Sequence, residues 1–261
     1  MARSNPLREV WNEGRIAFGL WAMVPGSFGA EILAGAGPDY VCVDQQHGLI
    51  GYDSMVPMLQ AVQAAGAAPI TRVLSNDPYE IMKSLDAGAW GVIVPLVNSA
   101  EEAARAVSAC RYPPDGIRSY GPVRASTVMG SADPGHLAKE SLCLVMVETR
   151  EALERVDEIA ATSGVDGIYI GPSDLTLSLG LSPTLEVVED EHIEAVNRIK
   201  ESCHRHNIVA GIHSPNGEWA RRHAEAGFDM VTVAMDASLL REAALSEIET
   251  ARAGHSSSGP G

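Results

Sequence analysis

The 261-residue sequence lacks the features of a membrane-spanning, secreted or nucleic-acid-binding protein. No apolar run reaches the roughly 20 residues that cross a bilayer. The start, residues 1–14, is polar and broken by Pro6, so it has no apolar core of a signal peptide. Basic residues are scarce: 19 Lys and Arg stand against 34 Asp and Glu, which gives a net charge of −15. Because an acidic chain is repelled by phosphate backbones and anionic lipid, we expect no nucleic acid and no membrane among its partners.

Cysteine is also sparse, and the sequence contains no CxxC pair. The four cysteines are Cys42, Cys110, Cys143 and Cys203. Two of them, Cys42 and Cys143, lie inside apolar, strand-like runs, where buried free thiols are expected. Free thiols fit a reducing compartment, so the sequence predicts a cytoplasmic protein.

Short β-branched runs alternate with longer amphipathic stretches along the chain. The expected strands are 16–23, 40–44, 69–73, 91–95, 142–147, 167–170, 209–213 and 230–234. The expected helices are 27–36, 54–65, 78–87, 100–110, 151–161, 192–206, 217–226 and 238–251. Strict alternation implies parallel strands with right-handed crossovers, and eight units in about 250 residues are typical of a (β/α)8 barrel. No GxGxxG follows the first strand, which disfavours the rival doubly wound sheet.

We therefore predict an α/β chain folded as one (β/α)8 TIM barrel, with its domain at residues 1–252. The low-complexity residues 253–261 are predicted to form a disordered tail. A long connection at 111–140 is rich in Pro and Gly, and connections of this length in compact domains are usually functional or disordered.

Polar residues gather where the predicted strands end, and chemistry in such barrels occurs at the carboxyl ends of the strands. They are Asp44 and His47 for the second strand, Arg72 for the third, Glu148 for the fifth, Ser173 and Asp174 for the sixth, His213 for the seventh and Asp236 for the eighth. The amino ends carry mostly Gly, Ala and Pro. The asymmetry supports the barrel and locates a candidate site.

Glu148 and Asp174 end neighbouring strands of this barrel. Two adjacent carboxylates repel each other unless a proton or a cation lies between them. Oxygen ligands without Cys or clustered His suit a hard ion such as Mg²⁺ or Mn²⁺. The structural alternative is an ion pair of Glu148 with Arg150 and a helix cap by Asp174.

Three further features each have a functional and a structural interpretation. Asp44, three residues before His47, could orient its ring as in a general-base pair, although a lone His more often packs or caps. Arg72 needs an anion, either a substrate oxygen or a structural carboxylate such as Asp44. The N–H groups of Ser173 and Asp174 could hold a carboxylate or belong to an ordinary helix start.

Together these pieces resemble the HpcH/HpaI aldolase family, the class II pyruvate aldolases, over residues 18–236. The matching blocks are Arg72 with Asn-Asp-Pro at 76–78, Leu-Asp-Ala-Gly at 85–88, Arg-Tyr-Pro-Pro at 111–114 with Gly116 and Arg118, Val-Glu-Thr-Arg-Glu-Ala at 147–152 and Gly-Ile-Tyr-Ile-Gly-Pro-Ser-Asp-Leu at 167–175. The resemblance implies a metal-dependent lyase that forms or cleaves 4-hydroxy-2-oxo acids from pyruvate, or a related 2-oxo acid, and an aldehyde. It also implies a homo-hexamer, a trimer of dimers that exchange their last helices.

The resemblance assigns the metal to Glu148 and Asp174, with Mg²⁺, Mn²⁺ or Co²⁺ as the ion. The backbone amides of Ser173 and Asp174 would hold the pyruvate carboxylate. Arg72 would contact the keto oxygen and stabilise the enolate, since positive charge is needed where that charge develops.

His47 would serve the acid/base steps, supported by Asp44 and by Asp86. Two positions depart from the family: Gln46 where Glu usually precedes the His, and Met146 where Gln is frequent. Both remove polar or charged character beside the metal. Three alternatives therefore stay open: an oxaloacetate decarboxylase, an enolate-addition enzyme of natural-product synthesis like macrophomate synthase, and a non-catalytic metal- or ligand-binding member.

Overall fold

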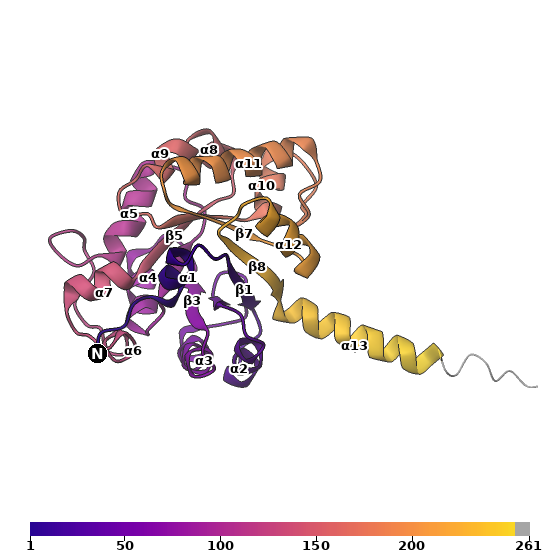
Figure 1. Cartoon of the computed structure of the whole chain (residues 1–261), viewed down its shortest axis with the longest axis horizontal. Coiled ribbons are helices and arrows are strands. Elements are labelled where there is room, and N and C mark those ends of the chain that lie inside the picture. Colours follow the sequence, from indigo (N-terminus) through magenta and orange to yellow (C-terminus); the bar gives the residue numbers. More distant parts are fainter. Residues whose placement is uncertain (254–261) are drawn as a thin grey trace, which may run out of the picture.

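Eight parallel strands close into a barrel in the computed structural model, which describes residues 1–253 (Figure 1). The strands are β1 (Ala17–Ala22), β2 (Tyr40–Asp44), β3 (Ala68–Arg72), β4 (Gly91–Val94), β5 (Leu142–Val147), β6 (Gly167–Ile170), β7 (Val209–His213) and β8 (Met230–Met235). Each strand pairs with the next along the chain, and β1 pairs with β8. The predicted (β/α)8 barrel is confirmed.

Burial on both faces explains why these strands are continuous apolar runs. All six residues of β5 are buried, as are all five of β2 and of β3. In a barrel one face of each strand meets the interior and the other meets the helices, so neither face needs polar side chains. The exceptions include strand ends, where the register places Asp44 of β2 directly beside Arg72 of β3, and Thr232 within β8.

The described residues contain thirteen helices, of which all but the last pack around the barrel. They are α1 (Pro6–Asn12), α2 (Ser27–Gly35), α3 (Tyr52–Ala64), α4 (Pro78–Asp86), α5 (Ala100–Cys110), α6 (Ala125–Met129), α7 (Pro134–Glu140), α8 (Arg150–Glu154), α9 (Val156–Ala160), α10 (Pro172–Leu179), α11 (Asp190–Arg205), α12 (Gly217–Glu225) and α13 (Asp236–Ala253). The single helix expected at 151–161 is two short ones, α8 and α9. The connection at 111–140 contains α6 and α7, which are too short to show helical periodicity.

Helix α1, which the sequence interpretation missed, packs against the amino ends of the strands. Asn5 caps it by accepting a hydrogen bond from the Leu7 N–H, and Pro6 occupies the first turn. The side chains of Leu7 and Val10 are buried in the barrel interior cluster. Trp11 is partly buried against the same cluster, and the rest of this short segment is mostly polar, which concealed the helix.

The last helix, α13, projects away from the barrel and buries none of its side chains in this chain (Figure 1). Ala253, predicted to begin the tail, ends this helix, and the rest of that tail, 254–261, lies outside the described residues. No helix in the described range, α13 included, has the length and apolarity needed to cross a bilayer.

Candidate active site at the carboxyl ends of the strands

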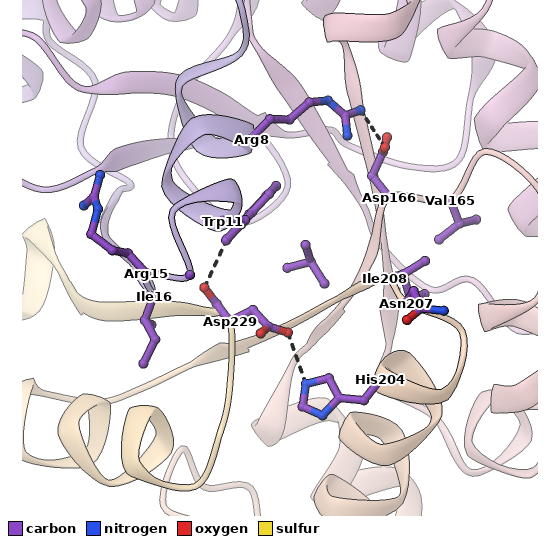
Figure 2. Close-up of a pocket in the computed structure, with 12 residues that line it drawn as sticks. Arg8, Trp11, Arg15, Ile16, Val165, Asp166, His204, Asn207, Ile208 and Asp229 are labelled. Carbon is purple, nitrogen blue, oxygen red and sulfur yellow. Dashed lines mark hydrogen bonds and ion pairs between the residues drawn. The ribbon is translucent and has the colours of Figure 1, made fainter.

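Two cavities open at opposite ends of the barrel. The larger, of about 580 Å³, lies at the amino ends, where Arg8 and Trp11 of α1 cover the strand starts (Figure 2). Its acidic groups already have partners: Arg8 pairs with Asp166 at 2.6 Å, and His204 with Asp229 at 3.2 Å. Charged groups in this end of a barrel stabilise the fold, since chemistry takes place at the other end.

The smaller cavity, of about 200 Å³, lies at the carboxyl ends of the strands. Its lining combines five of the polar residues singled out in the sequence with an apolar wall, of which the sequence indicated Met146 alone. The polar residues are His47, Arg72, Ser173, Asp174 and His213, and the apolar ones include Trp21, Met23, Met146, Leu185 and Met235. Because the apolar residues come from strand ends or loops far apart in sequence, no local motif marks them.

Asp44 and Arg72 form a buried, two-pronged ion pair at one side of this cavity. Arg72 donates from Nε to Asp44 Oδ1 at 2.9 Å and from Nη2 to Oδ2 at 2.5 Å. Trp21 also donates to Asp44, from Nε1 at 3.1 Å. Burial alone would raise the pKa of Asp44, but the hydrogen bonds and charge of Arg72 outweigh it and lower that pKa. Asp44 is therefore the structural partner considered for Arg72. The Nη1 atom of Arg72 makes no hydrogen bond within residues 1–253.

The structure corrects the expected support of His47 by Asp44. Asp44 Oδ1 accepts hydrogen bonds from the backbone N–H groups of Gln46 and His47, at 3.0 and 3.3 Å, and not from the ring. The carboxylate thus fixes the loop that carries His47, while the exposed ring lies at the cavity with no hydrogen-bond partner among the described residues.

Asp86 is likewise not brought to His47 within one chain. It ends α4, pairs with Arg118 at 2.8 Å and is absent from the cavity lining. The end of α4 leads into the amino end of β4, away from the carboxyl ends. Any contact of Asp86 with His47 would have to come from another subunit, and its assigned role stays a prediction.

Glu148, at the end of β5, is 2% exposed and has one free oxygen. Its Oε1 accepts a hydrogen bond from the Leu96 N–H at 2.8 Å, while Oε2 makes none within the described chain. Burial raises the pKa of Glu148 to about 7, and the nearby Asp174 carboxylate adds to the rise. A Cβ at Gly171 would lie 2.5 Å from Oε2, so the glycine leaves room for that oxygen where it stands. The alternative pairing with Arg150 is wrong, since Arg150 pairs with Glu191.

Ser173 and Asp174 occupy the first turn of α10, beside Glu148. The cap of this helix is Gly171, which has no side chain to bond the first N–H groups, and Pro172 follows it. The structural role considered for Asp174, a helix cap, is therefore wrong. Its exposed carboxylate lines the cavity, and unpaired first-turn N–H groups favour an anion there. Among residues 1–253 no cluster of three or more His, Cys, Asp or Glu forms a complete set of metal ligands.

Comparison with known proteins shows what the chain as a whole is similar to. The model of the HpcH/HpaI aldolase/citrate lyase family matches residues 17–243. The chain is 44% identical over 252 residues to the hydroxypyruvate/pyruvate aldolase of Rhizorhabdus wittichii, covering 95% of this chain and 99% of that protein. It is 37% identical to the 4-hydroxy-2-oxo-heptane-1,7-dioate aldolase of Klebsiella pneumoniae, covering 92% and 91%.

A solved structure shares the fold. The HpcH/HpaI aldolase/citrate lyase family protein from Burkholderia cenocepacia superposes with a TM-score of 0.88 at 30% identity, over 95% of this chain and 100% of that one.

Proposed function

Because the chain belongs to the HpcH/HpaI aldolase/citrate lyase family, we propose that the carboxyl-end cavity is the site of its class II aldolase chemistry. The chain is an aldolase that forms or cleaves 4-hydroxy-2-oxo acids. One observation carries the placement: the same cavity brings together Arg72, Ser173, Asp174 and His47, with the free oxygen of Glu148 beside Asp174. A pyruvate-type acid and an aldehyde are the proposed substrates.

The carboxylates Glu148 and Asp174 fit a divalent ion. The Oε2 of Glu148, which has no hydrogen-bond partner among the described residues, and the pKa of Glu148, raised by burial and by Asp174, support this proposal. All the available donors are oxygens, which suits Mg²⁺, Mn²⁺ or Co²⁺. When bound, such an ion supplies a Lewis acid that favours enolate charge on a 2-oxo acid.

Arg72 is the group that would stabilise the developing charge on the keto oxygen. Asp44 holds two of its nitrogens, so the guanidinium is fixed in orientation, and the free Nη1 is available to a substrate oxygen. A donor that is already oriented costs no reorganisation when the charge forms. Asp44 therefore acts as a positioning residue, through Arg72.

The first turn of α10 would bind the carboxylate of the 2-oxo acid. The N–H groups of Ser173 and Asp174 follow a glycine cap and a proline, so no side chain of the chain competes for them. Helix N-termini favour anions because several N–H groups and the helix dipole converge there.

His47 would move the proton of the 4-hydroxyl group. Its ring lies at the cavity and is free of hydrogen bonds with the described residues, so it can face the substrate. In cleavage it accepts the hydroxyl proton as the carbon–carbon bond breaks, and in synthesis it returns that proton to the aldehyde oxygen.

We further propose that two chains exchange their last helices, within a hexamer, and that the protein is cytoplasmic. Helix α13 carries the exposed residues Leu239, Leu240, Leu245 and Ile248 and buries none of them in its own chain. An apolar helix face without a covering partner favours association with a second copy. Light scattering that shows a monomer would contradict the exchange.

The test is an assay of metal-depleted and metal-reloaded enzyme against a panel of aldehydes with pyruvate and hydroxypyruvate. We expect chelation to abolish carbon–carbon bond formation and Mn²⁺, Mg²⁺ or Co²⁺ to restore it. Full activity after exhaustive metal removal would refute the mechanism. In a second arm the enzyme is given oxaloacetate without any aldehyde. Pyruvate release from oxaloacetate as the main activity would favour the decarboxylase alternative.

A further inference from the structure

A chain of buried hydroxyl groups inside the barrel ends on His213, beside the cavity. The Tyr40 hydroxyl lies 2.9 Å from Thr232 Oγ1, which lies 2.6 Å from the Tyr169 hydroxyl. The Tyr169 hydroxyl lies 3.3 Å from Nδ1 of His213. All four residues are buried, with Tyr40 and Thr232 at 0% exposure. The ring of Tyr40 occupies the space that a side chain at Gly19 would take, so this arrangement depends on a glycine in β1.

Counting protons gives an arrangement of these hydrogen bonds in which every hydroxyl donates to its neighbour. Each hydroxyl has one proton to donate, and a buried donor left without an acceptor is costly. Tyr40 donates to Thr232 Oγ1, the hydrogen-bond partner that its hydroxyl has at 2.9 Å among the described residues. Thr232 then donates to Tyr169, and Tyr169 donates to Nδ1 of His213.

His213 is therefore the neutral tautomer with its proton on Nε2. Burial, together with the charge of Arg72, lowers the pKa of His213 to about 3, which agrees with a neutral ring. The ring is held edge-on to Trp21, with centroids 5.0 Å apart. Nε2 has no hydrogen-bond partner in the described part of the chain, and the ring lines the cavity.

We infer that the Nε2–H of His213 binds a hydroxyl group of the substrate and selects hydroxylated substrates over their deoxy analogues. This rests on the proposed function, whose residues Arg72 and His47 already serve the keto and aldehyde oxygens. Trp21 and Met235 line the cavity together with His213, and the charge of Arg72, which acts on His213, is paired with Asp44. A neutral donor does not balance a carboxylate, so the group it recognises is an uncharged oxygen. A substrate without that oxygen leaves a buried N–H unpaired, which is how such sites discriminate.

The hydroxyl can be carried by the 2-oxo acid or by the aldehyde, and the experiment separates these sources. The kcat/KM values of metal-loaded enzyme are compared for hydroxypyruvate against pyruvate and for glycolaldehyde against acetaldehyde. His213→Phe keeps an aromatic ring beside Trp21 but removes the donor. We expect it to lower one of the two ratios about tenfold relative to the wild type. The ratio that falls identifies the substrate that carries the hydroxyl.

Three further variants separate hydrogen bonding from packing. His213→Gln keeps an N–H donor and should recover part of the lost ratio. Tyr169→Phe removes the hydroxyl that holds His213 in one tautomer and should give an intermediate ratio. His223→Phe, a matched change of another buried histidine outside the cavity, should leave both ratios unchanged. If both ratios in His213→Phe stay within about twofold of the wild type, the inference is wrong.

Failure of the proposed function would be seen separately, as an absence of turnover in the wild type with every pair. The dissociation constants of the same four compounds, measured by calorimetry, would then decide the role of His213 on the same tenfold criterion.

Discussion

Replacing Asp44 by Asn tests whether the ion pair with Arg72 organises the site. The carboxylate accepts two hydrogen bonds from Arg72, one from Trp21 and two from the backbone of the loop at 46–47. Asn keeps the size but removes the charge and one acceptor, so the buried guanidinium loses its counter-ion. Breaking a buried pair in this way costs about 3–5 kcal/mol. In a chain of this size each kcal/mol of lost stability lowers the Tm by about 2–4 °C, so we expect the Tm to fall by about 6–20 °C.

The assay is differential scanning calorimetry of metal-free protein, with urea unfolding as a second measurement. The matched control is Asp157→Asn, which removes an exposed carboxylate paired with Arg205 and should cost no more than about 1 kcal/mol. The kcat/KM of Asp44→Asn should also fall about a hundredfold, because Arg72 is no longer held in place. A Tm within about 2 °C of the wild type together with unchanged kcat/KM would refute the reasoning.

Further outcomes follow from the same site. Asp174→Ala should weaken metal binding about a hundredfold or more in a calorimetric titration, and an unchanged titration would refute the ligand assignment. His47→Ala should keep the metal affinity of the wild type but lower kcat about 10²–10⁴-fold, and wild-type turnover would place the base elsewhere. Burial lowers the pKa of His223 to about 4 in the folded protein. As the pH falls below about 6.5, His223 is protonated in the unfolded chain but still neutral in the folded one, so the free energy of unfolding decreases. Between pH 7 and pH 5 this amounts to about 2 kcal/mol, and the difference in unfolding free energy between those pH values should shrink by that amount in His223→Phe. An identical pH dependence in both proteins would contradict the assignment.

Much of the fold was predictable because it depends on local patterns. Eight β-branched runs in alternation with amphipathic stretches are enough to specify a closed parallel barrel, which the structure confirms. The short helices were not predictable: α1 and α6 are too brief for a 3.6-residue period to stand out.

The candidate site was predictable to the extent that strand ends are visible in the sequence. Glu148, Asp174 and Arg72 were found because the carboxyl ends of neighbouring strands meet in a barrel. The sequence offered Asp44 as one of two partners for Arg72 but could not decide between them, and it could not locate Asp86, because the partner of a charged side chain is whichever group lies next to it in space. Asp44 lies on the neighbouring strand beside Arg72, 28 residues away, whereas Asp86 faces Arg118 on the outer layer.

By itself the sequence determined the architecture and the end of the barrel at which the polar groups gather, since both follow from the order of apolar and polar residues. Only the tertiary structure decided which of those groups are free to act. It paired Asp44 with Arg72, left one oxygen of Glu148 open beside Gly171 and set the tautomer of His213 through residues as far apart as Tyr40 and Thr232. Hydrogen bonds are satisfied in three dimensions between strands distant in sequence, and no local pattern records those partners.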